Sequence, residues 1–196
     1  MKFALIVATV AVAVLSSTAI ASESDHRSPY AGEQTRPIKS LSAEDIAELR
    51  RGGGWGLAKA AELNGMPGPA HLLEMRDEIP LDEMQVGRIE ALYAEMRAAA
   101  IVEGEKLIAL EAELDRHFRD GTITEALLRK SLDEIAATQR TLRFVHLSTH
   151  LKTPAILSED QIAAYNALRG YADADPCANV PEGHDPAMWR KHNGCE

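Results

Sequence analysis

The sequence predicts an all-α protein built on a long antiparallel helical hairpin with short flanking helices. Ala, Leu, Glu and Arg, which favour helices, dominate the middle of the 196-residue chain. Aromatic residues make up only 5% of the chain, too few for the strands of a sandwich or barrel. Apolar residues also recur at steps of three and four along two long stretches, which is the period of amphipathic helices. We therefore expect one helical domain over residues 41–170.

The first residues have the three parts of a secretory signal peptide. Lys2 supplies the positive start, residues 3–15 form an apolar run, and residues 19–21 are a small-x-small cleavage site. The apolar run is shorter than the roughly 20 residues that a membrane-spanning helix needs, although an uncleaved anchor is the alternative. We expect cleavage after Ala21, a periplasmic location, and a flexible leader over residues 22–40.

Short helices are expected before and after the hairpin. Three of them precede it, over residues 41–51, 55–63 and 71–78, and a run of three glycines ends the first. A final short helix is expected over residues 159–168, followed by an irregular tail over residues 171–196.

The two long helices are predicted from amphipathic spacing. The first covers residues 82–119 and stops at Asp120-Gly121, and the pair Thr122 and Glu125 forms a capping box for the second. The predicted face of the first helix carries Ile89, Leu92, Met96, Ala99, Leu107, Leu110, Leu114 and Phe118. The predicted face of the second helix carries Leu128, Leu132, Ile135, Gln139, Leu142, His146 and Thr149. These two faces should pack together.

Two polar side chains interrupt these faces at matching heights. A turn near Gly121 brings Glu103 beside Gln139. A hydrogen-bonded polar layer that fixes the register of the helices is one interpretation. A ligand-binding or pH-sensitive spot is the other.

One short pattern, a leucine, a capping residue and a glutamine three residues later, opens two of the predicted helices. The motif residues are Leu81, Asp82 and Gln85 in one copy and Leu157, Ser158 and Gln161 in the other, and a looser copy begins at Leu41. The side chain of the capping residue accepts a hydrogen bond from a backbone N–H in the first turn of the helix. The glutamine side chain in turn accepts one from the backbone N–H of the capping residue. Each capping box stabilises a helix start by about 1 kcal/mol, so the pattern by itself is structural.

The two motif copies flank the hairpin of an exported helical chain, and in this respect the sequence resembles the LTxxQ-motif periplasmic family. This family comprises Spy/CpxP/ZraP-like proteins, with CnrX-like metal-sensing domains as distant relatives. Ser158 and Asp82 stand where the motif has threonine. The resemblance implies a homodimeric, ATP-independent chaperone or envelope-stress protein that binds unfolded or partly folded envelope proteins. The alternative that it implies is a heavy-metal-binding sensor, or a signalling adaptor with a membrane sensor partner.

The resemblance implies the client-binding function, and the helical period supplies the face that would carry it. The predicted client-binding face consists of Leu92, Met96, Leu107, Leu110, Leu142 and Val145. Each of these residues also suits an ordinary core position.

A metal site is the other candidate. His146 and His150 are four residues apart, so both side chains lie along one helix face and suit Zn, Cu or Ni. Glu90, Met96 or His71 are candidates to complete the coordination shell. Core or surface histidines are the alternative, and client binding requires no cofactor.

The tail contains both cysteines of the chain, Cys177 and Cys195. An even number of cysteines in an exported protein predicts a disulfide, with free thiols as the alternative. A metal site that adds His184 and His192 is a further alternative, but its spacing matches no zinc module.

Charge and motifs exclude other functions. The formal net charge of −9 lacks the basic patch that nucleic acid requires. The chain has no serine-nucleophile motif, and its glycine run follows a predicted helix instead of a strand, which indicates a hinge and not a phosphate site. We therefore expect no enzymatic activity and no nucleic-acid partner.

Overall fold

The computed structural model describes residues 26–172, 177, 180 and 183–195. The chain divides into two units, residues 1–34 and 35–196. The predicted signal peptide lies outside the described residues. In the first unit, residues 26–34 form turns that lead into a 3-10 turn, Glu33–Thr35. All other helices belong to the second unit, and no strand occurs among the described residues, which confirms the all-α prediction.

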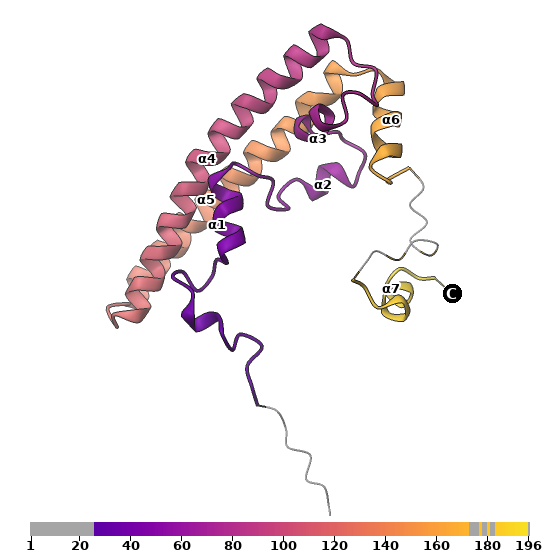
Figure 1. Cartoon of the computed structure of the whole chain (residues 1–196). Coiled ribbons are helices and arrows are strands. Elements are labelled where there is room, and N and C mark those ends of the chain that lie inside the picture. The colour runs from indigo at the N-terminus through magenta and orange to yellow at the C-terminus, as the bar shows by residue number, and fades with distance from the viewer. Residues whose placement is uncertain (1–25, 173–176, 178–179, 181–182, 196) are drawn as a thin grey trace, which may run out of the picture. The chain divides into compact units, whose positions relative to one another are not determined.

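Two long helices, α4 (Glu83–Arg119) and α5 (Glu125–Lys152), pack together along the second unit (Figure 1). The connection between them turns at Gly121, whose φ of +64° is a conformation that favours glycine. The capping residue of α5 is Thr124, which accepts from the Leu127 N–H, and not the predicted Thr122. Thr122 instead pairs its hydroxyl with the His117 ring, because the turn brings it back over the end of α4.

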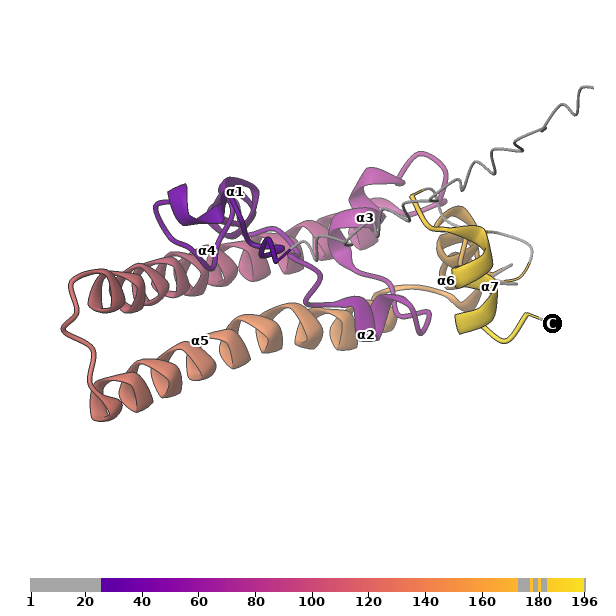
Figure 2. The ribbon, with the colours of Figure 1, turned by 90° about the horizontal axis from the view of Figure 1, so that it is seen from below.

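Short helices surround this helix pair. They are α1 (Ala43–Arg50), α2 (Lys59–Glu62), α3 (Pro69–Glu74), the 3-10 turn η2 (Thr153–Ile156), α6 (Glu159–Leu168) and α7 (Pro186–His192). Figure 2 shows α1 and α3 beside α4, and α2 beside α5. The predicted helix over residues 55–63 shrinks to α2, because Trp55 and Gly56 both adopt positive φ and form a turn.

The second unit has two apolar clusters. The first joins Ile38, Leu41 and Leu49 from the N-terminal side to Ala100, Leu107 and Ile108 of α4 and to Ile135 and Leu142 of α5. The second consists of Leu72, Ile79, Ile89 and Tyr165. Ile38 lies inside the range predicted to be a flexible leader, yet it is buried in the first cluster. The packed structure therefore includes residues before Leu41.

The buried face of α5 keeps Ile135, Leu142, His146 and Thr149 of the predicted face but differs in its other members. It consists of Ser131, Ile135, Thr138, Leu142, His146, Thr149 and His150. The predicted members Leu132 and Gln139 are exposed. The predicted Glu103–Gln139 layer is therefore wrong, because Gln139 is exposed and Thr138 takes the buried position beside it.

The two motif copies meet at the start of α4 and α6. Asp82 and Ser158 are the N-caps, and each forms a capping box with its glutamine. The side-chain amides of Gln85 and Gln161 bond reciprocally, with both N···O distances at 2.9 Å. Each amide also donates to a backbone carbonyl across the contact, Gln85 to Ile156 and Gln161 to Pro80, at 2.8 Å. The glutamines therefore both cap their helices and join them.

Candidate functional site

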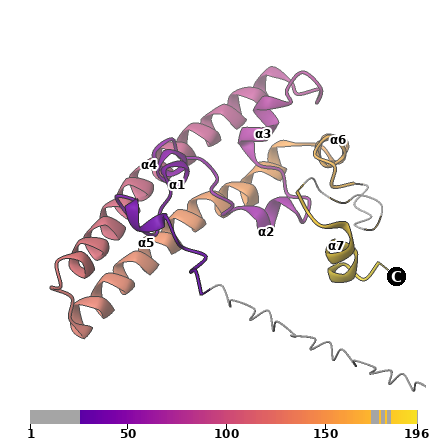
Figure 3. The ribbon, with the colours of Figure 1, turned by 60° about the horizontal axis from the view of Figure 1, so that its bottom comes forward.

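A cavity of about 260 Å³ lies between the helix pair and the residues that connect α1 to α3. Its wall includes His71 from α3, Met96 from α4, and His146 and His150 from α5, and we call it the histidine cavity. Figure 3 shows α2 and α3 beside the two long helices that supply these side chains. Four of the predicted candidate ligands thus line one space, namely His71, Met96, His146 and His150.

His150 has a fixed ring orientation. Its Nδ1 lies 2.8 Å from the carbonyl oxygen of Met66, and because a carbonyl only accepts, Nδ1 carries the proton. The Nε2 atom of a neutral His150 therefore keeps a lone pair. Gly68 packs so closely that a Cβ built there would lie 2.7 Å from Nε2, so the backbone closes one side of the ring.

His146 is the least satisfied polar group of the cavity. Its side chain is 3% exposed, and its Nε2 has no hydrogen-bond partner among the described residues. Burial lowers the pKa of His146, the neighbouring His150 lowers it further, and the charge of Glu48 acts in the opposite direction. The neutral ring thus dominates at pH 7, and this is the form that binds a metal ion.

His71 is engaged by carboxylates. Its Nδ1 lies 2.9 Å from Glu74, and its Nε2 lies 3.6 Å from Glu62. Burial raises the pKa of Glu62, but hydrogen bonds from Tyr171 and Arg169 outweigh it and hold the pKa below the usual range. Glu62 is therefore ionised and already hydrogen-bonded, and because His71 holds Glu74 through Nδ1, its Nε2 is the ring nitrogen left to act as a metal ligand.

The fit to a metal ion is thus partial. Within the described ranges, no three His, Cys, Asp or Glu side chains stand close enough to hold one. Glu90, a predicted candidate, is exposed and does not line the cavity. Two imidazoles and the thioether of Met96 are the donors that face the cavity without strong competing partners, and such a set suits a soft or borderline cation.

A second depression, of about 190 Å³, lies between α4 and α5 and is mainly apolar. Leu92, Met96 and Ala99 line it from α4, and Phe144 and Val145 line it from α5. We call it the apolar groove. Phe144 is 67% exposed, and Glu95 and Lys152 stand at the rim, 4.0 Å apart.

The predicted client-binding residues divide between two environments. Leu92, Met96 and Val145 line the apolar groove. Leu107 and Leu142 are only 0% and 1% exposed in the first apolar cluster, and Leu110 packs against that cluster. Sequence reasoning missed Phe144, because it falls off the helical period of the stripe.

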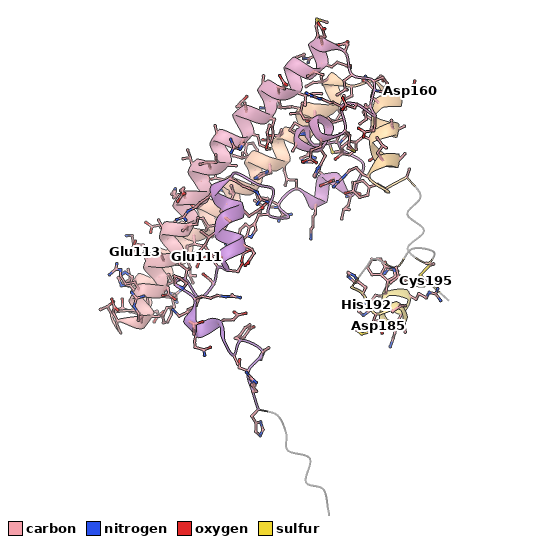
Figure 4. All side chains as sticks on the ribbon, viewed as in Figure 1. Glu111, Glu113, Asp160, Asp185, His192 and Cys195 are labelled. Atoms are coloured by element: carbon pink, nitrogen blue, oxygen red, sulfur yellow. A yellow bond between two sulfur atoms is a disulfide. The ribbon has the colours of Figure 1, made fainter. Side chains whose placement is uncertain are left out.

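The tail confirms the predicted disulfide between Cys177 and Cys195, whose Cα atoms lie 5.3 Å apart. Both sulfur atoms are used, so the alternative metal site with His184 and His192 lacks its thiolate ligands. Figure 4 labels Asp185, the N-cap of α7, together with His192 and Cys195.

Comparisons with models of known protein families, with curated proteins and with solved structures find no match to this chain. Among the described residues, no helix has the length and apolar character needed to cross a membrane. The histidine cavity and the apolar groove are therefore the two candidate sites of this protein.

Proposed function

We propose that this protein is a periplasmic, ATP-independent chaperone or envelope-stress protein that binds partly folded proteins in the apolar groove. In this proposal α4 and α5 form an antiparallel hairpin of the Spy/CpxP-like kind, and two copies form a homodimer. The supporting observation is that Leu92, Met96 and Val145, which the sequence predicts as client contacts, meet in one groove beside the exposed ring of Phe144.

The chemistry of the groove suits brief, unspecific apolar contacts. An exposed phenylalanine beside an apolar depression offers a large area to an incoming aliphatic or aromatic side chain. The charged rim, Glu95 and Lys152, keeps the free protein hydrated. Such a surface binds many apolar segments and requires no nucleotide to release them.

The first prediction concerns Phe144. The wild-type protein should suppress aggregation of an unfolded client in a light-scattering assay, and Phe144→Ser should weaken client binding about tenfold, as truncation of an aromatic anchor does. Phe118→Ser is the matched control, because Phe118 is also an exposed phenylalanine but lies at the other end of α4, outside the groove. Equal losses in both variants, or no suppression at several-fold excess, would contradict the proposal.

A second candidate function is metal sensing at the histidine cavity. The buried Nε2 of His146, which has no partner among the described residues, favours it, because a buried polar atom is costly unless a ligand satisfies it. His150 adds a second imidazole whose free Nε2 is set by the Met66 bond. His71 is the candidate third ligand.

The second prediction tests this site by titration calorimetry with zinc, copper and nickel. His146→Ala and His150→Ala should each lower affinity by at least about tenfold, whereas His117→Ala, outside the cavity, should leave it unchanged. Because the pKa of His146 lies below its usual 6.5, protons compete with metal there only in acid. Affinity should therefore hold at neutral pH and fall only in acid. Unchanged affinity in both cavity variants would show that the metal ion does not bind in the histidine cavity.

A further inference from the structure

The face that Leu107 and Leu142 form is covered by a segment of the chain itself. This segment, residues 38–54, comprises α1 with its two flanks, and we call it the cover. Ile38, Leu41 and Leu49 of the cover complete the cluster that buries Leu107 and Leu142. The predicted client face is thus divided between an open part, the apolar groove, and a covered part.

The cover lies against α4 at two points where only glycine fits. A Cβ on Gly104 of α4 would lie 2.6 Å from the carbonyl oxygen of Leu49. A Cβ on Gly52 would lie 2.8 Å from the carbonyl oxygen of Arg97, and Gly52 also has a φ of +70°. Glycine weakens the interior of a helix, so Gly104 lowers the helix propensity of α4 at the point where α1 makes contact.

Away from these points the cover is held by the buried side chains of Ile38, Leu41 and Leu49 and by polar contacts at the surface. Its helix, α1, has 8 residues, too few to be stable without packing. Its polar contacts to α4 are exposed, as for Arg50 with Glu105 at 3.2 Å and Ser40 with Glu111 at 2.8 Å. Figure 4 labels Glu111 on α4. The free energy of local opening is lower for a short helix of this kind than for the helix pair beneath it.

We infer that the cover is an autoinhibitory segment that competes with clients for the Leu107 and Leu142 face. Its local opening offers that face to an amphipathic client segment with leucine or isoleucine three residues apart, the spacing of Ile38 and Leu41. This inference rests on the client-binding function proposed above. It adds a second binding surface whose availability the chain itself controls.

The third prediction compares Gly104→Ala with Gly87→Ala. Both glycines lie in α4, but a Cβ on Gly87 would meet nothing within 4 Å, so Gly87→Ala is the matched control. Gly104→Ala should displace α1, speed hydrogen exchange of the residue 43–50 amides, and raise affinity for an unfolded client several-fold. Gly87→Ala should leave exchange in α1 and client affinity unchanged.

Leu49→Ala provides a second way to loosen the cover without altering α4, in case Gly104→Ala unfolds the whole protein. Faster exchange in α1 with unchanged client affinity in these variants, while the wild type binds client, would overturn the autoinhibition. Absence of client binding in the wild type and in every variant would instead count against the proposed function itself.

Discussion

Replacing Leu107 with alanine is expected to lower the free energy of unfolding by about 3–4 kcal/mol. Leu107 is fully buried at the centre of the first apolar cluster, where side chains from the cover, α4 and α5 meet. Removing its terminal carbons loses their burial and leaves a cavity that the surrounding helices fill only in part. Urea denaturation followed by circular dichroism measures this loss.

Val102→Ala is the control for Leu107, since Val102 lies on the same helix but is 66% exposed. It should change stability by less than about 0.5 kcal/mol. A Leu107→Ala loss as small as the control's would show that the cover does not pack on this face in solution. That outcome would also remove the basis of the autoinhibition.

Gln161→Leu is expected to lower the free energy of unfolding by about 2 kcal/mol. The change removes the amide that bonds Gln85 and the Pro80 carbonyl and that accepts from the Ser158 N–H. Gln161 is buried, whereas Pro80 and Ser158 are exposed and Gln85 is half-buried, so each lost hydrogen bond contributes about 0.5–1 kcal/mol. Thermal unfolding of the variant beside the wild type measures the effect.

Two further variants separate this network from a general effect of leucine. Gln139→Leu, on the exposed side of α5, should be nearly neutral. Replacing both Gln85 and Gln161 should lower the free energy of unfolding by about 1–2 kcal/mol less than the sum of the two single replacements. The reason is that the two amides share their hydrogen bonds. Strict additivity would mean that the two motif copies act only as separate helix caps.

The candidate site was partly predictable from local spacing. The i, i+4 rule places His146 and His150 on one side of α5, and both line the histidine cavity. Glu90 was not excluded by spacing, because a helical pattern does not show which side of α4 a distant segment covers. Phe144 was missed for a related reason, since exposed apolar residues carry no periodic signal.

Local rules account for the two long helices, α6 and the caps Asp82 and Ser158, but they misplace the cap of α5 and make α2 too long. Amphipathic period, capping boxes and turn glycines act between residues that are close along the chain, so their effects are visible in the order of the residues. The rotation of α5 that buries Thr138 instead of Gln139 depends on packing across the helix pair. The packing of α1 against Gly104 and the hydrogen bonds between Gln85 and Gln161 likewise join residues far apart in the chain. Packing between distant segments also encloses the histidine cavity and covers half of the predicted client face, because a side chain's exposure is set by what folds against it.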